Sequence, residues 1–452
     1  MEQFFEKFSS YAWGLPLVIL LIGGGLYLLI LSKFLPFRYI GHAIQVLRGK
    51  YDDPDDPGQI SHFKALSTAL SSTIGMGNIA GVAVAISIGG PGAMFWMWVS
   101  AVVGMSTKFF TSTLAIMFRG KDSAGVLQGG PMYFIVEGLG KSWKPLAIMF
   151  SFFGMIGVLP VVNVNQLTQA INDIVLIPNG VAVGFKTNVA IAFILVISTS
   201  IVIIGGLKSI SSVASKMVPT MVILYFILVL IILIANYEVV PKYFLMIFTD
   251  AFAADNFKGD PFLGGLFGAL VLLGIRRGAF SNEAGIGTAP MAHGAAKTDE
   301  PVREGLVAML GPAIDTLVVC SLTALAILVT GVWETTSNNG VSLTASAFEA
   351  TMPVYGKYLL MVCVLIFSVS SLFSYSYYGT KCLSFLIGDD KKHYFNYFYI
   401  LSIIIAVMTP FSMMLNLIDG VFALMAIPTM VSTLILAPKV IVEFKKYKAK
   451  ID

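Results

Sequence analysis

Charged residues are scarce in this sequence. They make up 12% of the 452 residues, about half of the share that is usual in soluble domains. Hydrophobic residues make up 57%, and the mean hydropathy is +0.84. The composition therefore excludes a soluble globular protein and predicts an all-α polytopic membrane protein. No polar stretch is long enough to form a separate soluble domain.

Cysteine, histidine and catalytic motifs are also scarce. Cys320, Cys363 and Cys382 fall in apolar windows without metal-ligand spacing, so we interpret them as small packing residues and not as disulfides. No apolar window contains a His-Glu-x-x-His motif, paired aspartates or a Ser–His arrangement. This argues against a membrane enzyme, and no catalytic residue is predicted. Neither the position nor the surroundings of His293 indicate a proton relay.

The amino-terminal region lacks the basic residues and the Ala-x-Ala site of a signal peptide. We therefore expect the apolar run Leu15–Leu31 to be a retained helix. A membrane-spanning helix needs about 20 mostly apolar residues. About eleven windows meet this requirement: 15–35, 64–90, 93–118, 145–175, 188–206, 214–236, 262–295 with an interruption, 303–331, 354–386, 395–410 and 414–437.

Basic residues are unevenly distributed between the loops. With the amino terminus outside, most of the 29 Lys and Arg residues fall on the cytoplasmic side or at its membrane edge, among them Lys108, Arg276 and Arg277. The positive-inside rule then predicts a multi-pass protein of the cell membrane with a cytoplasmic carboxyl terminus. In the basic tail, a contact with the lipid bilayer is favoured over nucleic-acid binding. We predict no nucleic-acid partner and no obligate protein partner.

The windows after the first divide into two groups of five. An odd number of crossings gives the groups opposite orientations in the membrane, which is typical of inverted-topology repeats. Each group begins with a glycine-interrupted segment and carries a less hydrophobic stretch between its second and third windows, at Gly129–Leu139 and Val341–Met352. The predicted organisation is an accessory helix and cytoplasmic loop (1–63), a first repeat (64–236), a second repeat with an extracellular linker (237–437) and a basic cytoplasmic tail (438–452).

The first interrupted segment is rich in polar and flexible residues at its middle, from Ser71 to Asn78. Glycines there favour a broken helix, which membranes tolerate only where the backbone lines a cavity. The N–H groups of Gly75, Met76 and Gly77 are expected to be free and suit a carboxylate. The carbonyls before the break, around Ser71, Thr73 and Ile74, suit a monovalent cation. The predicted solute contacts are Thr73, Gly75, Met76, Gly77 and Asn78, although small residues at close helix packing give the same pattern.

The second interrupted segment runs from Phe262 to Ala296. Gly274, Gly278, Gly285 and Gly287 all offer breakpoints, and the predicted solute contacts Ser281, Asn282 and Glu283 lie among them. A carboxylate inside a span is costly and usually faces a cavity or a partner. Glu283 is expected to receive an ammonium group or line an ion path; the alternative is an ion pair with Arg276 or Arg277.

Two further windows carry polar faces. In 354–386, Ser370, Ser371 and Ser374 follow helical spacing, with Ser370 and Ser374 on one face. Their hydroxyls with the Phe367 carbonyl would complete a five-oxygen sodium site against the first break, unless these serines only bond back to their own helix. The predicted sodium ligands are Ser71, Ile74, Phe367, Ser370, Ser371 and Ser374. In 145–175, Asn165 and Gln169 share a face, either contacting a polar solute or bonding to another helix. Asp315 and Asp419 are expected to pair with buried groups or to gate a path.

Two motifs resemble one known family. GGPGAMFWMWVSAVVG, at Gly89–Gly104, is similar to the signature of the alanine or glycine:cation symporters, and so is RGAFSNEAGIGTAP at Arg277–Pro290. The resemblance covers essentially the whole chain. It implies a relative of the amino acid-polyamine-organocation transporters, with the leucine-transporter fold of five plus five inverted helices. It also implies that sodium is co-transported with alanine or glycine.

The same resemblance assigns roles to particular residues. It implies that Ser71 and Ile74 bind sodium through carbonyls, Ser370 or Ser371 through a hydroxyl, and that Gly75–Asn78 form the turn for the substrate carboxylate. Two alternatives are a proton-coupled amino-acid transporter and a channel. A channel would need a continuous polar file or a charged ring, whereas this sequence has clustered polar breaks.

Overall fold

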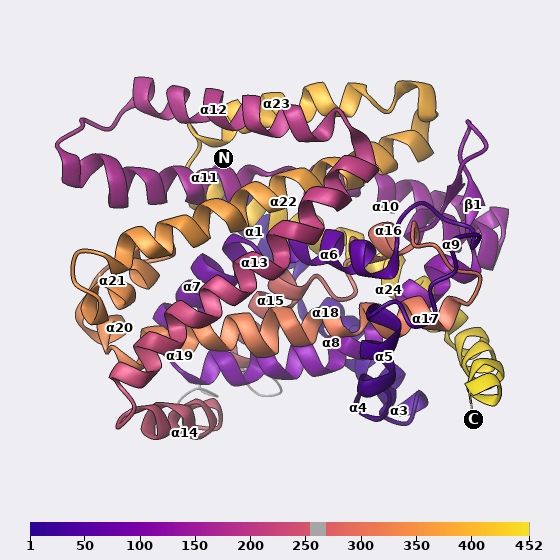
Figure 1. The fold of residues 1–452 in the computed structure, drawn as a ribbon, viewed down its shortest axis with the longest axis horizontal. Helices are drawn as coiled ribbons and strands as arrows, with labels where there is room; N and C mark the ends of the chain where they lie inside the picture. The colour runs from indigo at the N-terminus through magenta and orange to yellow at the C-terminus, as the bar shows by residue number, and fades with distance from the viewer. Residues whose placement is uncertain (254–267, 452) are drawn as a thin grey trace.

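The chain folds into a bundle of long helices in a computed structural model that describes residues 1–253 and 268–451. The long helices run side by side along the longest axis of the molecule (Figure 1). In the described ranges, the only sheet is an antiparallel pair of two-residue strands, β1 (Gly120–Lys121) and β2 (Leu127–Gln128). The all-α class predicted from composition is confirmed.

The amino-terminal half contains most of the shorter elements. In chain order these are α1 (Glu2–Ala12), α2 (Leu15–Val18), η1 (Ile19–Gly23), α3 (Gly24–Leu31), α4 (Leu35–Arg38), α5 (Ile40–Leu47), α6 (His62–Thr73), η2 (Gly77–Gly81), α7 (Val82–Gly89), α8 (Gly92–Met117), α9 (Pro131–Leu139), η3 (Lys141–Trp143), α10 (Lys144–Gly157), α11 (Val161–Ala170), η4 (Ile171–Leu176), η5 (Ile177–Asn179), α12 (Phe185–Ile203) and α13 (Gly206–Ala235).

The carboxyl-terminal half follows after α14 (Val240–Ala251). Its elements are α15 (Ala269–Asn282), α16 (Ala289–His293), α17 (Pro301–Ala308), α18 (Leu310–Pro312), η7 (Ala313–Cys320), α19 (Ser321–Val329), α20 (Val332–Thr335), α21 (Val341–Thr351), α22 (Gly356–Ile387), η8 (Asp389–Lys391), α23 (Tyr394–Ala406) and α24 (Phe411–Ile451). Residues 262–267 of the second predicted interrupted segment lie outside the described ranges.

Helix length and composition identify the membrane-spanning elements. In the described part of the chain, 7 helices are long and apolar enough to cross a membrane, or up to 9 if each bent pair is one span. The bent pairs are Glu2–Ala12 with Leu15–Leu31, at 48°, and His62–Thr73 with Gly77–Gly89, at 53°. The second pair is the predicted first broken segment, so the structure confirms a break there.

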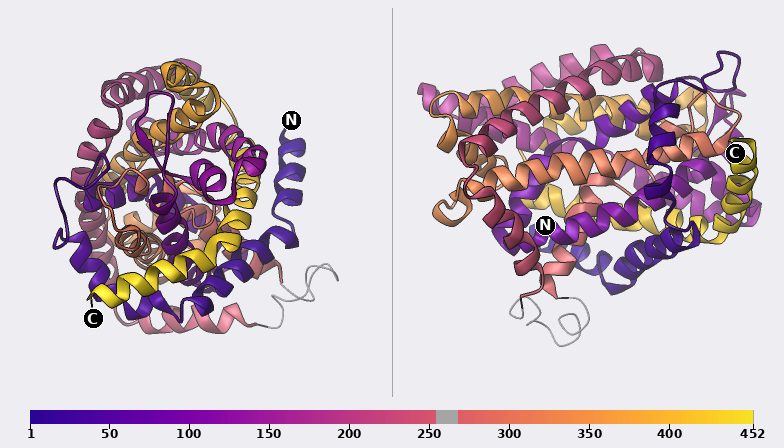
Figure 2. Two further views of the ribbon diagram at one scale, coloured as in Figure 1. Left: turned by 90° about the vertical axis from the view of Figure 1, so that its right-hand side faces the viewer. Right: turned by 60° about the horizontal axis from the view of Figure 1, so that its bottom comes forward.

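The two less hydrophobic stretches form short helices, α9 and α21. They lie at opposite ends of the bundle (Figure 1). Seen from the end that carries α9, the bundle has a rounded outline, and the carboxyl-terminal part of α24 lies across it (Figure 2, left). Helix α24 has 41 residues and would extend about 60 Å if straight, so it is longer than the membrane core is thick.

Helix α8 lies at the centre of the packing and contacts α3, α14, α15 and α17. A Cβ atom on Gly274 would lie 2.5 Å from the Trp96 side chain, and one on Gly278 would lie 2.8 Å from that of Ser100. These two glycines therefore serve close packing of α15 on α8, and neither is a breakpoint. The Gly89–Gly104 motif forms the turn from α7 into α8, where the Gly92 N–H donates to Asp250 at 2.7 Å.

Three of the basic residues that the sequence assigns to the cytoplasmic side or its membrane edge lie within α8 and α15. Lys108 is 2% exposed in the interior of α8, beside Gly311. Arg276 and Arg277 lie in α15 and contact the amino-terminal part of α24. By contrast, Lys297 and Arg303 contact the Gly49–Gly58 loop.

Candidate functional site

The first break lies between Thr73 and Gly77. Helix α6 ends at Thr73, Ile74 has an extended ψ of 91°, and the chain resumes as the π-helical turn η2. A Cβ atom on Gly75 would lie 2.6 Å from Ser371 Oγ of α22, so only glycine allows this approach. The break therefore places the non-helical backbone around Gly75 against α22.

Asn78 fixes the shape of this break. Its Oδ1 accepts a hydrogen bond from the Gly75 N–H at 2.9 Å, and its Nδ2 donates to Asp315 Oδ1 at 2.7 Å. The expectation that the Gly75 N–H is free was wrong, because the Asn78 side chain occupies it. Asn78 therefore caps its own half-helix, which leaves the N–H groups of Met76 and Gly77 as the candidate anion donors at the start of η2.

Asp315 of η7 joins the two broken segments. Besides Asn78, it accepts hydrogen bonds from Ser281 at 2.8 Å and from Thr316 at 2.7 Å, and its side chain is fully buried. Buried carboxylates require such donors because an unpaired charge is costly away from water. Of the predicted solute contacts, Asn78 and Ser281 therefore meet here at one carboxylate.

The second break follows Asn282. Glu283 adopts a left-handed conformation with φ of 52°, and Gly285 and Gly287 have φ of 85° and 106° before α16 begins at Ala289. The Asn282 side chain accepts from the Ala284 N–H at 3.0 Å and donates to Thr316 at 3.2 Å. The glycines supply the left-handed backbone that the turn requires.

Glu283 contacts hydroxyl groups and not the arginines. Tyr375 Oη donates to it at 2.7 Å, and Thr288 Oγ1 also donates. The alternative of an ion pair with Arg276 or Arg277 was therefore wrong. Tyr375 also lines the small cavity at the first break, so it connects Glu283 with that cavity.

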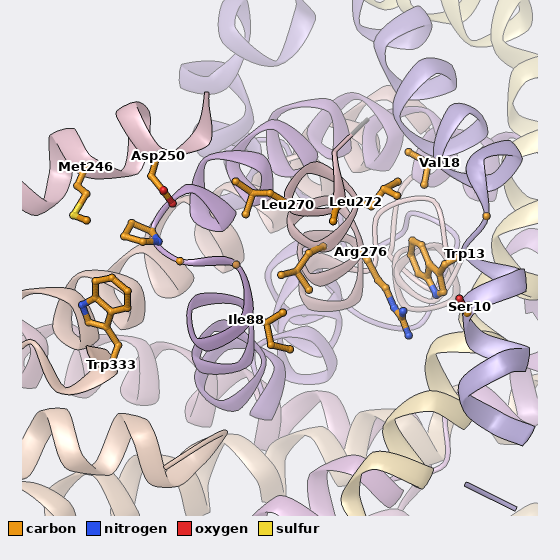
Figure 3. Close-up of a pocket in the computed structure, with 16 residues that line it drawn as sticks. Ser10, Trp13, Val18, Ile88, Met246, Asp250, Leu270, Leu272, Arg276 and Trp333 are labelled. Atoms are coloured by element: carbon orange, nitrogen blue, oxygen red, sulfur yellow. The ribbon is translucent and has the colours of Figure 1, made fainter. Parts of the chain in front are cut away.

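The two arginines instead form ion pairs with Asp419 of α24. This agrees with the expectation that Asp419 pairs with buried groups. Asp419 Oδ2 accepts from Arg276 Nε at 2.9 Å and from Arg277 Nη2 at 2.7 Å. Trp13 donates to the Asp419 carbonyl at 2.8 Å. Arg276 and Trp13 face one another at one end of a cavity of about 750 Å³ that extends to Asp250 and Trp333 (Figure 3).

The serines of α22 gather with the first break. Ser71 donates to the Ser370 carbonyl at 2.7 Å, and Ser374 donates to Ser71 Oγ at 2.9 Å. The hydroxyls of Ser370 and Ser371 both donate to the Phe367 carbonyl at 3.0 Å. The predicted ligand residues on α22 thus lie against the α6 break, where carbonyl and hydroxyl oxygens form a set that suits a hard cation.

A small cavity of about 20 Å³ lies beside this oxygen cluster. Thr73, Gly75 and Gly77 of the predicted contacts line it. The rest of its wall is formed by Ser72, Gly157, Leu159, Val162, Asn163, Phe280, Tyr375 and Ile418. The cavity therefore lies between the first break, α11, α22 and α24.

Asn165 and Gln169 lie elsewhere. Asn165 Nδ2 donates to the carbonyls of Ala406 and Thr409 at 3.2 and 2.6 Å, and Gln169 bonds with Gln166 at 2.8 Å. Asn163, two residues earlier on the same helix, is the amide that reaches the cavity. Sequence reasoning identified the polar cluster but chose the other face of α11.

Two broken helices that meet deep in a helical bundle, beside a small polar cavity, define a membrane transporter for a small solute. The sodium:alanine symporter family model matches residues 1–452. The chain belongs to this family.

Relatives and a solved structure agree with this assignment. The sodium/alanine symporter AgcS of Methanococcus maripaludis is 38% identical, with 97% of this chain and 95% of that protein covered. The probable sodium/glutamine symporter GlnT of Bacillus subtilis is 31% identical, with 99% and 92% covered. The crystal structure of MhsT in complex with L-phenylalanine has a similar fold, with a TM-score of 0.60 at 13% identity over 86% of this chain and 99% of that chain. These relatives are symporters, in line with the prediction that the chain is not an enzyme.

Proposed function

We propose that this protein is a sodium-coupled symporter that imports alanine and glycine across the cell membrane. The observation that carries the proposal is the small cavity at the first break, which adjoins the oxygen cluster of Ser71 and Ser370–Ser374. A cavity of this size holds about one water molecule, so it marks the place where a small substrate would bind and would have to widen to admit it. The relative AgcS is named a sodium/alanine symporter, which supports sodium as the ion and alanine as the amino acid.

In the proposed complex, the substrate carboxylate binds the Met76 and Gly77 N–H groups at the positive end of η2. Thr73, Gly75 and the cap residue Asn78 shape this turn, and Ser281 and Asn282 hold the second break against it through Asp315 and Thr316. Tyr375, held by Glu283, lies on the α22 side, where the substrate ammonium group would approach. From α11, Asn163 would contact the polar substrate, in place of Asn165 and Gln169.

The co-transported sodium ion would bind between α6 and α22. Its proposed ligands are the carbonyls of Ser71, Ile74 and Phe367 and the hydroxyls of Ser370 and Ser371. These hydroxyls now donate to Phe367, and each would turn a lone pair toward the ion on binding. Ser374, which donates to Ser71 Oγ, would hold Ser71 in position.

We infer an architecture of eleven crossings with two inverted repeats of five, at 64–236 and 237–437. An accessory helix and loop (1–63) and a basic tail (438–452) flank the repeats. The amino terminus is outside and the carboxyl terminus is cytoplasmic. The similarity to MhsT and the placement of α9 and α21 at opposite ends support this arrangement.

Transport would follow alternating access. Sodium first stabilises the contact of α6 with α22 and completes the cavity, after which the amino acid binds. In this structure the contact of Arg276 and Arg277 with Asp419 closes the side on which α15 and the first part of α24 meet. Separation of α15 from α24 would open that side to the outside.

Sodium-dependent binding of labelled alanine to the purified protein tests the proposal. We expect saturable binding in sodium that falls at least about tenfold when potassium replaces it, since the ion completes the binding pocket. Glycine should compete with alanine. Binding of equal strength in potassium at fixed pH would contradict sodium coupling, and stronger competition by glutamine than by glycine would contradict the substrate assignment.

A further inference from the structure

Three buried polar side chains meet where α6, α16 and α17 come together. They are His62, the first residue of α6, His293, the last residue of α16, and Glu304 of α17, each at most 1% exposed. His62 Nδ1 contacts Glu304 Oε2, and His293 Nδ1 lies 2.5 Å from Glu304 Oε1. The Glu304 carboxylate therefore contacts two half-helices. These are α6, which precedes the first break, and α16, which follows the second break.

The backbone joins the same two half-helices directly. Ile60 and Ala296 form a parallel bridge, in which the Ile60 N–H donates to Ala295 at 3.2 Å and the Lys297 N–H donates to Ile60 at 2.7 Å. These bonds tie the start of α6 to the end of α16, but they do not attach either one to the rest of the bundle. A displacement of one half-helix would therefore carry the other with it, against the packing of α6 on α13 and α22 and of α16 on α8.

Glu304 attaches these two half-helices to a part of the bundle that is packed tightly. Helix α17 lies along α8, where a Cβ atom on Gly305 would overlap the Thr113 side chain. Arg119 Nε adds a bond to the Gly294 carbonyl at 3.0 Å, and Lys381 Nζ adds one to the Met291 carbonyl at 2.8 Å. Arg119 also donates to the carbonyls of Pro57, Ala296 and Thr298, all outside α6 and α16, whereas Glu304 contacts a side chain of each half-helix.

Charged groups surround the cluster on several elements. Asp52 of the Gly49–Gly58 loop lies 3.9 Å from His62 Nε2, and Arg303 of α17 interacts with His62 through space. Arg119 interacts with Glu304 in the same way. Burial lowers the pKa of Arg119 to about 10, so its guanidinium stays charged at neutral pH. Movement of α6 and α16 would remove two donors from a buried carboxylate, which makes that movement unfavourable.

A cavity of about 290 Å³ lies beside these two half-helices, and Gln59, Tyr377 and Lys381 line it. Tyr377 Oη donates to the Met291 carbonyl of α16 at 3.3 Å. Deeper in the bundle, Ser72 of α6 contacts Tyr378 at 3.3 Å and lines the substrate cavity. Displacement of α6 and α16 would thus connect the two cavities.

We propose that Glu304 is a positioning residue of the transport cycle, which keeps the cytoplasmic side closed by holding His62 of α6 and His293 of α16 against α17. Both contacts break together when that side opens. This proposal rests on the proposed transport function and adds the contact that opposes release of the substrate to the cytoplasm.

The test measures access to the substrate cavity from each side of the membrane. Ser72→Cys places a thiol at the cavity, and a membrane-impermeant maleimide is applied to inside-out and right-side-out vesicles without sodium or amino acid. Adding Glu304→Ala should speed labelling about tenfold or more in inside-out vesicles only, because a hydrogen bond to a charged group is worth at least that factor. Glu304→Asp should restore part of the closed state.

Glu300→Ala is the matched control, since Glu300 precedes α17 and contacts Lys450 at 2.7 Å but neither histidine. The His62→Ala and His293→Ala changes should each speed labelling, and together no more than Glu304→Ala does, because they share one carboxylate. A lower melting temperature for Glu304→Ala with unchanged labelling would show a structural role only and would overturn the proposal. Equal acceleration in both vesicle orientations would overturn it as well. Because no substrate is present, a failure of sodium coupling would leave these comparisons intact.

Discussion

Alanine uptake by the Asn78→Ala protein is expected to be roughly 100-fold lower than that of the unchanged protein at equal expression, because two buried hydrogen bonds are lost at once. The Gly75 N–H loses its acceptor, and Asp315 loses a donor that lies 2.7 Å away. The turn between α6 and η2 would then no longer hold the Met76 and Gly77 N–H groups in place for a carboxylate.

Asn172→Ala is the matched control for this change. Asn172 is also a buried asparagine in the bundle, but it bonds with Asn188 at 3.1 Å and lies outside the cavity. Its replacement should leave uptake within about twofold, as is usual away from a functional site. Uptake by Asn78→Ala at the normal rate and with the normal sodium dependence would rule out the role given to Asn78.

Replacement of Ser371 by alanine is expected to raise the sodium concentration for half-maximal uptake about tenfold, while saturating sodium restores most of the rate. The change removes one of five proposed oxygen ligands, and a lost polar contact of this kind typically costs about one factor of ten. Ser370→Ala should act in the same direction. The measurement is alanine uptake over a sodium titration at constant ionic strength.

Ser368 provides an internal comparison on the same helix. It is fully buried, but its hydroxyl has no hydrogen-bond partner among the residues that the structure describes and lies outside the proposed ligand set. Ser368→Ala should therefore leave the sodium dependence unchanged. Ser371→Ala could instead lower the uptake rate by the same factor at every sodium concentration and leave the half-maximal sodium concentration unchanged. In that case the hydroxyl supports the fold and does not bind the ion.

The sequence was sufficient to predict the membrane-spanning character and the first break, because both depend on local composition. Ser71–Asn78 combines hydroxyls, glycines and an amide within one apolar window, and the helix does break there. The second break could not be located, because the four glycines of this segment look alike in sequence. Gly274 and Gly278 pack against α8, whereas Gly285 and Gly287 adopt left-handed backbone.

Contacts between distant segments were beyond the reach of sequence periodicity. The helix between Lys141 and Asn179 is interrupted after Gly157, and α11 begins only after Pro160. Within α11, periodicity groups Asn165 with Gln169 but does not show which face of the helix reaches the cavity, and it is Asn163 that lies there. The partners of Asn78 and Arg277, which are Asp315 and Asp419, lie 237 and 142 residues away and could be found only in three dimensions.

Uptake of labelled alanine into proteoliposomes under separate ion gradients tests the central claim most directly. An inward sodium gradient at equal pH on both sides should drive accumulation, and an inside-negative potential should increase it, because each charge gains about 2.3 kcal/mol per 100 mV. A proton gradient in sodium-free buffer should drive none. Accumulation driven equally well by protons without sodium would contradict sodium-coupled symport by this protein.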